Sequence, residues 1–278
     1  MTLPDSEIVY TYRRMNTSER TVAALDFAQY PSGEPLVRFN DNLLVDTILL
    51  RQKNMSAFLA MLAFVDALVE RGHEVPHLIV PQFPGARQDR LNTEGDYLFT
   101  VKTFARMTNA RNFPSVTVVD PHSDVTPALL DRCRVIRPTW RFSGEQYAGI
   151  VSPDAGAEKR ASSWAKTNEV PLFHAWKSRD IRTGAISKFG CEPLPRDRHY
   201  LIVDDLCDGG GTFIGLEGEI KQQDCTADLY VTHGLFTKGT EPLLQRFKRV
   251  FTSDSTVGDK PGVTVIPFCS DLLTRTPK

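Results

Sequence analysis

The sequence predicts an α/β protein in which mainly parallel sheets are flanked by helices. Short apolar runs alternate along most of the chain with longer stretches of helical periodicity, and this alternation is typical of strands joined by crossover helices. Acids, basic residues and glycines follow directly after several of the apolar runs. With 278 residues, the chain is long enough for one large α/β unit or for two domains of ordinary size.

The first half of the chain contains the clearest predicted helix. Residues 35–50 alternate loosely between apolar and polar, which predicts β structure. From Asn54 to Arg71 apolar residues recur at helical spacing, with Asn54 as the expected N-cap and Gly72 as the expected stop. Three further elements are expected in this half: a strand at 77–83, a helix at 97–109 and a buried strand at 115–120.

Strand and helix alternate again in the second half of the chain. The pattern predicts a strand at 150–152, a helix at 156–166 and strands at 172–176, 199–203 and 229–232. We place a domain boundary near residue 145, within the stretch 140–147. This boundary divides the chain into a first domain of residues 1–145 and a second domain of residues 146–278.

The candidate functional residues lie where the chain leaves the predicted strands. In open parallel sheets, ligands bind beyond the carboxyl ends of the strands. Four groups lie at such positions: residues 84–87, His122, Asp154, and the pair Asp204 and Asp205. These turns are therefore expected to supply a small-molecule site.

Composition excludes several classes of protein. The chain carries 33 basic and 34 acidic residues, so it lacks the basic excess of a nucleic-acid-binding protein. No apolar run approaches the roughly 20 residues that a membrane span needs, and the polar N-terminus is unlike a signal peptide. Five scattered cysteines fit reduced thiols better than disulfides or a zinc site. The expected location is the cytoplasm.

The most informative stretch is residues 200–213, where an apolar strand leads into a glycine-rich turn. Asp204 and Asp205 follow the strand, and a third acid, Asp208, precedes three glycines and Thr212. Carboxylates can accept hydrogen bonds from ribose hydroxyls, and glycines let backbone N–H groups approach a phosphate closely. The stretch therefore predicts a binding loop for a phosphorylated sugar. The alternative is an ordinary loop in which the acids are incidental.

This stretch resembles the motif shared by type I phosphoribosyltransferases and ribose-phosphate diphosphokinases (PRPP synthetases). Further segments occur in the order found in the second family, and together the resemblance spans about residues 25–275. Those segments are Tyr30-Pro31-Ser32-Gly33-Glu34, Gly85-Ala86-Arg87-Gln88-Asp89-Arg90, Val119-Asp120-Pro121-His122-Ser123, Val151-Ser152-Pro153-Asp154-Ala155-Gly156 and Thr232-His233-Gly234-Leu235-Phe236. The chain is therefore expected to be a diphosphokinase of this kind.

The resemblance implies two similar α/β domains with the site between them. It implies transfer of the β,γ-diphosphoryl group of ATP to the anomeric hydroxyl of ribose 5-phosphate, with Mg²⁺ as cofactor. The first domain would supply ATP and metal segments, and the second the ribose-phosphate loop and a catalytic lid. Family members assemble as symmetric oligomers, so a homo-oligomer, a dimer or a hexamer, is expected; nucleic acid and membrane are not expected partners.

The resemblance also assigns roles to individual residues. It implies metal binding by His122 and Asp154. It implies catalytic roles for Lys177 and Arg179, which begin a mobile loop that continues as a lid through residues 180–195. The implied ATP contacts are Glu34, Arg87, Gln88, Asp89 and His122. The implied ribose-phosphate contacts are Asp204, Asp205, Asp208, Gly209, Gly210, Gly211 and Thr212.

The sequence departs from the family pattern at three of these places. Gly209 replaces the threonine of the family's Asp-Thr-x-Gly-Thr loop, Ser178 replaces the middle arginine of Lys-Arg-Arg, and Ser32 replaces an acid. A roomier loop would accept a larger ribose 5-phosphate ester such as ADP-ribose, although neutral sequence drift explains the same glycines.

Two other classes of function stay open. A phosphoribosyltransferase that attaches a base shares the sugar loop, but it has no use for the remaining segments. A non-catalytic relative is expected to lose the loop lysine or the metal positions, and this chain keeps both.

Overall fold

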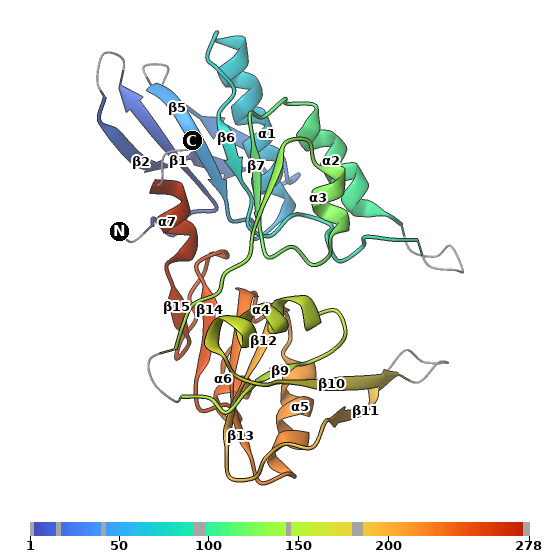
Figure 1. The fold of residues 1–278 in the computed structure, drawn as a ribbon. Coiled ribbons are helices and arrows are strands. Elements are labelled where there is room, and N and C mark those ends of the chain that lie inside the picture. The colour runs from blue at the N-terminus through green and yellow to red at the C-terminus, as the bar shows by residue number, and fades with distance from the viewer. Residues whose placement is uncertain are drawn as a thin grey trace. The chain divides into compact units, whose positions relative to one another are not determined.

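The computed structural model describes residues 3–14, 18–39, 43–91, 98–142, 146–179 and 186–274, with only the backbone at 178, 179 and 186–188. The chain forms two compact units (Figure 1). The first unit consists of Met1–Ile136, Asp254–Gly258 and Pro267–Lys278, and the second of Arg137–Ser253 and Asp259–Ile266. The sequence placed the boundary near residue 145 and assigned everything after it to the second domain, whereas two C-terminal segments belong to the first unit.

The sheet of the first unit has six strands and combines an antiparallel part with a parallel part. Its order is β2-β1-β5-β6-β7-β8. Strands β2, β1 and β5 pair antiparallel, and β5 through β8 pair parallel. The strands are β1 (Ile8–Arg14), β2 (Arg20–Ala24), β5 (Leu43–Leu50), β6 (His77–Ile79), β7 (Val116–Val119) and β8 (Cys133–Ile136).

Helices bury the apolar side chains of this sheet. The long helix α1 (Met55–Glu70) begins at Asn54, whose side chain accepts hydrogen bonds from two backbone N–H groups, as the sequence predicts. Its buried face shares one apolar cluster with the sheet and with α2 (Thr100–Asn109). The short α3 (Val125–Leu129) lies between β7 and β8 in the chain. Helix α7 (Phe268–Thr274) packs on β1 and β5 through Cys269 and Leu273, which is why the C-terminus belongs to this unit.

The sheet of the second unit has seven strands in the order β11-β10-β9-β12-β13-β14-β15. All neighbours pair parallel except β10 and β11, which form an antiparallel hairpin at one edge. The strands are β9 (Ile150–Ser152), β10 (Leu172–Arg179), β11 (Ile186–Cys191), β12 (His199–Cys207), β13 (Thr226–Gly234), β14 (Val250–Ser253) and β15 (Thr264–Ile266).

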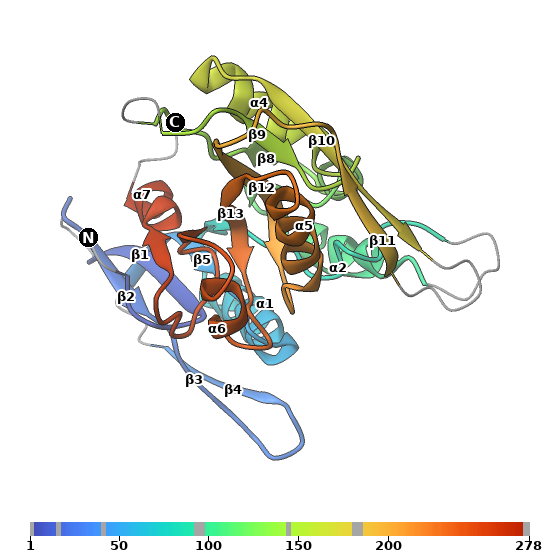
Figure 2. The same cartoon turned by 90° about the horizontal axis from the view of Figure 1, so that it is seen from below.

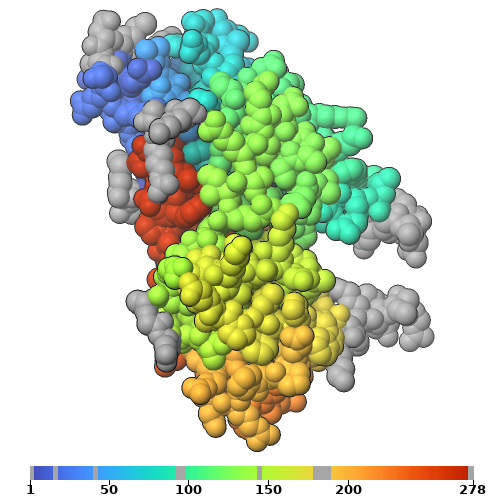
Figure 3. Space-filling view, viewed as in Figure 1, coloured from blue at the N-terminus to red at the C-terminus, as the bar shows by residue number. Residues whose placement is uncertain are grey.

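Helices α4 (Glu158–Asn168) and α5 (Gly211–Lys221) cover opposite faces of this second sheet (Figure 2). Trp164 of α4 packs with Tyr230 and Leu201 in one apolar cluster. Phe213, Leu216 and Ile220 of α5 belong to another, together with residues of β12 and β13. Residues of α4 form part of the visible surface of this unit (Figure 3). The expected α/β fold with two mainly parallel sheets flanked by helices is confirmed.

Three strands of the second unit extend further than the sequence predicts, and one of them is β13, expected at 229–232 and observed at Thr226–Gly234. The strand expected at 172–176 continues to Arg179 because it pairs with β11, which lies inside the stretch interpreted as a lid. The strand expected at 199–203 continues to Cys207, so Asp204 and Asp205 lie within β12 rather than after it. Residues 180–185 of the expected lid lie outside the described part of the chain.

A separate two-stranded hairpin, β3 (Asp26–Gln29) and β4 (Pro35–Arg38), projects from the first unit (Figure 2). A short four-residue helix, α6 (Glu241–Leu244), follows β13 in the second unit. Among the residues that the structure describes, no helix is long and apolar enough to span a bilayer.

Candidate active site

Two neighbouring strands of the first unit, β6 and β7, deliver the predicted ATP residues to one edge of the sheet. Arg87, Gln88 and Asp89 follow β6, and His122 follows β7. Because β6 and β7 pair in parallel, both turns leave the sheet at its carboxyl edge. The structure therefore brings together four of the residues that the sequence assigns to ATP.

Asp89 is buried at this edge while its neighbours are exposed. Its Oδ1 accepts a hydrogen bond of 2.9 Å from Arg90 Nε. Burial on its own raises the pKa of the Asp89 carboxyl, but Arg90, Ser123 and His122 together outweigh burial and leave that pKa lowered. Its Oδ2 is buried and has no hydrogen-bond partner in the described part of the chain. An ionised carboxylate oxygen is thus available to a cation or a ligand next to His122.

The turn that carries Arg87 and Gln88 is fixed by close packing against α2. Gly85 has a φ of +73°, and a Cβ there would lie 2.8 Å from the ring of Phe104 and 2.9 Å from the N of Val101. The Oε1 of Gln88 accepts a hydrogen bond of 2.6 Å from Thr100. Glycine is needed at position 85, because any side chain would push the turn off the helix.

Glu34 lies away from this group, at the tip of the β3–β4 hairpin. The turn is closed by hydrogen bonds between Tyr30 and Glu34 and between Gly33 and Tyr30. The Ser32 hydroxyl donates to Glu34 Oε2 at 2.7 Å, so the residue that replaces the family's acid now positions the remaining one. Tyr30 is half exposed at this tip.

In the second unit, Lys177 of β10 forms an ion pair with Asp154, which follows the neighbouring strand β9. The Nζ–Oδ2 distance is 2.7 Å, and about a quarter of each side chain is exposed. The other carboxylate oxygen, Oδ1, accepts from the backbone N–H groups of Gly156 and Ala157. Asp154 is thereby held at the start of α4, facing the lysine.

The acid pair of β12 is bridged by Arg160, a residue that the sequence analysis did not single out. Arg160 Nη1 lies 3.0 Å from Asp204 Oδ1 and 3.5 Å from Asp205 Oδ1. The backbone N–H of Asp205 also donates to Asp204 Oδ1. Arg160 is only 6% exposed, and a buried arginine requires an acidic partner. Its position six residues after Asp154, on the helix that follows β9, was the available signal.

Burial and neighbouring charges shift the pKa of the Asp204 carboxyl, and not all of them act in the same direction. Burial, and after it the charge of Asp205, raises its pKa well above the usual range, while Arg160 lowers it. Two adjacent buried carboxyls resist double ionisation. Arg160 is therefore the cation that offsets the repulsion between the two carboxyls.

The glycine turn after β12 has the conformation of an anion-binding loop. Gly210 has a φ of +78° and is the N-cap of α5, with no side chain capping the helix. A Cβ on Gly211 would meet nothing within 4 Å, so the space beside the first turn of α5 is open. Uncapped amides at a helix start favour a negatively charged ligand.

The segment after β13 packs against this turn. Thr237 Oγ1 donates to Asp208 Oδ1 at 2.6 Å, and its backbone N–H donates to the Asp208 carbonyl at 3.0 Å. The side chain of Lys238 runs along Gly209, where a Cβ would lie 3.2 Å from Lys238 Cδ. His233 is buried within β13, beside Leu206 of β12.

The second unit thus brings most of its predicted residues to the carboxyl ends of β10, β9 and β12, which are adjacent. Gly156 links the two charged groups, because its carbonyl accepts from Arg160 and its N–H donates to Asp154. The side chain of Arg179 and residues 180–185 lie outside the described part of the chain. The described residues contain no group of three or more His, Cys, Asp or Glu that could hold a metal ion.

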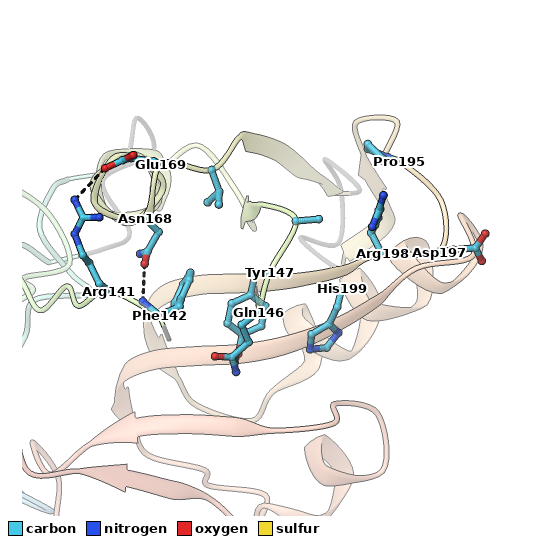
Figure 4. Close-up of a pocket in the computed structure, with 12 residues that line it drawn as sticks. Arg141, Phe142, Gln146, Tyr147, Asn168, Glu169, Pro195, Asp197, Arg198 and His199 are labelled. Atoms are coloured by element: carbon cyan, nitrogen blue, oxygen red, sulfur yellow. Dashed lines mark hydrogen bonds and ion pairs between the residues drawn. The ribbon is translucent and has the colours of Figure 1, made fainter. Parts of the chain in front are cut away.

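A cavity of about 760 Å³ in the second unit lies elsewhere, near the amino ends of β9 and β12 (Figure 4). Beneath it, the buried Asp228 accepts from Tyr147 Oη at 2.7 Å and from Arg249 Nε at 2.8 Å. The lining includes Arg141, Tyr147, Glu169, Arg198 and His199. None of the predicted site residues lines this cavity.

The chain is similar to several known proteins. A ribose-phosphate pyrophosphokinase of Mycoplasma genitalium is 30% identical over 256 residues, which cover 86% of this chain and 74% of that protein. That of Pyrococcus furiosus is 25% identical over 264 residues, which cover 91% and 93%. The crystal structure of phosphoribosylpyrophosphate synthetase from Mycobacterium smegmatis superposes with a TM-score of 0.74 at 21% identity, covering 91% of this chain and 90% of that one. No protein-family model matches the chain.

Two mainly parallel sheets flanked by helices, an uncapped glycine turn and charged residues at the strand ends are features of an α/β enzyme that could bind phosphorylated ligands. The extent and identity of the match to the Mycoplasma protein are more specific. The chain belongs to the ribose-phosphate pyrophosphokinase family, and the expected family and fold are confirmed.

Proposed function

We propose that this chain transfers the β,γ-diphosphoryl group of ATP to the anomeric hydroxyl of ribose 5-phosphate. The hydroxyl oxygen forms a bond to the β-phosphorus, and the bond from that phosphorus to the α-phosphate oxygen breaks. AMP leaves with that oxygen, and the hydroxyl proton passes to solvent. Family membership and the arrangement of charged residues support this reaction.

The reaction gathers several negative charges, so catalysis depends on positioning and on charge neutralisation. In this proposal Lys177 places its ammonium on the transferring group, and Arg179 neutralises phosphate oxygens. The ion pair with Asp154 aims the lysine before ATP binds. Arg87, Gln88 and Asp89 bind the nucleotide in the first unit, and Glu34 contributes from its hairpin.

Mg²⁺ is the cofactor that the family implies, and the residues present fit it. Magnesium prefers oxygen ligands and keeps several of its waters, so a few carboxylates are sufficient. Asp89 has a buried carboxylate oxygen without a hydrogen-bond partner among the described residues, and His122 lies close to it. We propose His122, which lies beside Asp89 in the first unit, and Asp154 in the second unit as metal-binding residues; a bound Mg²⁺ would neutralise charge on the ATP phosphates.

The sugar phosphate is bound by the second unit in this proposal. Asp204, Asp205 and Asp208 accept hydrogen bonds from the ribose hydroxyls, while Arg160 holds the first two acids in place. The first-turn amides of α5 and the Thr212 hydroxyl bind the 5-phosphate. The turn formed by Gly209, Gly210 and Gly211 allows this close approach.

One observation carries the proposal. A lysine–carboxylate pair, an arginine-bridged acid pair and an uncapped glycine turn occur together at the carboxyl ends of three adjacent strands. A base phosphoribosyltransferase needs only the last two of these features. The lysine and the residues around Asp89 and His122 favour the diphosphokinase.

The test incubates purified protein with ATP, Mg²⁺ and ribose 5-phosphate, without any base, and measures AMP and the 1-diphosphate product. We expect both products in equal amounts, and none after the metal is removed with EDTA. Failure to form AMP with any ribose 5-phosphate derivative would overturn the diphosphokinase. Pyrophosphate release from the 1-diphosphate in the presence of a base would instead support the phosphoribosyltransferase.

We also propose that the chain acts in the cytoplasm and that it forms a homo-oligomer. The second part rests on the symmetric assembly of family members. Light scattering coupled to size-exclusion chromatography measures the assembly directly, and a monomeric mass at working concentration would contradict this part of the proposal.

A further inference from the structure

The sugar-phosphate loop differs from the family pattern in a way that changes its chemistry. The family's Asp-Thr-x-Gly-Thr loop has a threonine where this chain has Gly209, so one hydroxyl donor is absent. The stem of Lys238 lies in the adjoining space: a Cβ on Gly209 would be 3.2 Å from its Cδ and 3.3 Å from its Cε. The aliphatic part of a lysine side chain therefore lies beside the position at which the family's loop carries a short neutral donor.

The amine of Lys238 is available to a ligand. The residue is exposed, and no ion-pair partner is present for its ammonium among the residues that the structure describes. Its segment is fixed relative to the loop, because Thr237 makes two hydrogen bonds to Asp208. The turn is further held by Thr240, whose hydroxyl donates to the carbonyl of Pro261 at 2.8 Å.

There is also room for a substituent beside the loop. Gly211 begins α5, and a Cβ there would meet nothing within 4 Å. The adjoining Gly210 is packed, with a Cβ position 3.1 Å from Leu243. The open side of the loop is thus at the first turn of the helix.

These features match an esterified phosphate better than a terminal one. A terminal phosphate presents three strong acceptor oxygens, and esterification turns one of them into a weak, bridging oxygen. Because an esterified phosphate has one strong acceptor fewer, a loop with one donor fewer loses little binding free energy with it. If the substituent begins with a second phosphate, the ammonium of Lys238 supplies a charge-assisted hydrogen bond to it.

Resting on the proposed diphosphokinase function, we infer that the preferred acceptor is a ribose 5-phosphate whose phosphate is joined to a second phosphate, as in a nucleoside diphosphate ribose. The anomeric hydroxyl of this ligand is unchanged, so the same bonds form and break as with ribose 5-phosphate. AMP leaves, and the product carries a diphosphate at C1 and its original group at C5.

Binding and turnover test this inference separately. Calorimetric titration with ADP-ribose, ribose 5-phosphate and ADP measures binding without requiring chemistry. We expect ADP-ribose to bind at least tenfold tighter than ribose 5-phosphate, and ADP not to reproduce its affinity. Ribose 5-phosphate binding equally well or better would overturn the inference. AMP release with any acceptor decides the proposed function, independently of which acceptor binds best.

Two variants locate the effect. Lys238→Ala should weaken ADP-ribose about tenfold, the value of one charge-assisted hydrogen bond, and change the affinity for ribose 5-phosphate much less. Lys221→Ala, an exposed lysine at the end of α5, is the matched control and should change neither. Gly211→Leu, which fills the open space, should weaken ADP-ribose selectively. Equal losses for both ligands in either loop variant would contradict the assignment.

Discussion

The ammonium of Lys177 lies 2.7 Å from the carboxylate of Asp154. The sequence assigned these residues to different tasks, one to charge stabilisation and the other to a metal ion. Lys177 lies in β10, and Asp154 lies in the turn that follows the neighbouring parallel strand β9. Both side chains are only partly exposed. The carboxylate therefore orients the lysine in the protein without ligand, and this pairing makes the lysine the most direct target for mutation.

Replacing Lys177 by alanine should lower kcat by at least about a hundredfold, the usual loss when one oriented charge is removed from a transition state. The fold should be unaffected, because the side chain is partly solvated. Steady-state AMP release and the circular dichroism melt measure the two effects. Lys166→Ala, on the exposed side of α4, is the control and should behave like the wild type; full activity in K177A would remove the catalytic assignment.

Arg160→Gln should destabilise the second unit by about 3 kcal/mol, because it leaves two adjacent buried carboxyls without their cation. The urea midpoint measures this loss. Adding Asp204→Asn to that variant should restore part of the stability, since one of the unpaired charges is then gone. If the losses of stability in the two single variants simply add in the double variant, the ion pair between Arg160 and Asp204 contributes nothing.

Gly215→Ala should impair the β10–β11 hairpin that carries Lys177. A Cβ at Gly215 would lie 2.1 Å from the ring of Phe189 on β11, so the ring must move. We expect a loss of activity of about tenfold or more. Gly218→Ala, one turn further along α5, meets nothing within 4 Å and should add up to about 1 kcal/mol of stability. Similar activities for the two variants would show that the ring contact is irrelevant.

The buried carboxylate of Asp228 should make stability depend on acid pH. Burial, the largest influence, raises the pKa of Asp228, but His199, Tyr147 and Arg249 outweigh it and leave that pKa lowered. His199 Nε2 lies 3.1 Å from Asp228 Oδ2. A lowered native pKa means that the unfolded chain binds the proton first as the pH falls.

The stabilisation from Asp228 is therefore complete above its ordinary pKa of about 4 and disappears as the pH falls through the lowered native value. Urea midpoints between pH 6 and pH 2.5 should fall less steeply in Asp228→Asn than in the wild type. That variant should also lose about 2 kcal/mol at pH 6, because Arg249 loses a charged partner. The exposed Asp259→Asn should retain the wild-type slope; an unchanged slope in D228N would contradict this account.

Local signals in the sequence were sufficient for the first long helix and for the glycine turn, whereas the strands β1, β2, β8, β14 and β15 were not predicted. The helix from Asn54 begins where its cap residue predicts, because a side chain that accepts from the first-turn amides acts within a few residues. The glycine turn after β12 was recognised for the same reason: positive φ at Gly210 is a local requirement. The strand ends were less accurate, since β10 and β12 extend as far as their neighbours continue to pair.

Contacts between distant residues were beyond the reach of such signals. The position of Arg160 on the helix after β9 does not by itself identify it as the partner of Asp204, because that helix meets β12 only once the sheet has formed. The same is true of the strand β11 inside the expected lid, which exists because β10 offers it an antiparallel edge.

The sequence by itself determined the α/β class and the family, and it supplied the candidate residues for phosphate and sugar binding, because short contiguous motifs carry each of these. Tertiary structure alone decided that Lys177 pairs with Asp154, that Arg160 bridges two acids, and that the C-terminal helix α7 joins the first unit. These outcomes depend on which buried charges and apolar faces meet when strands far apart in the chain align, and no local pattern encodes that alignment.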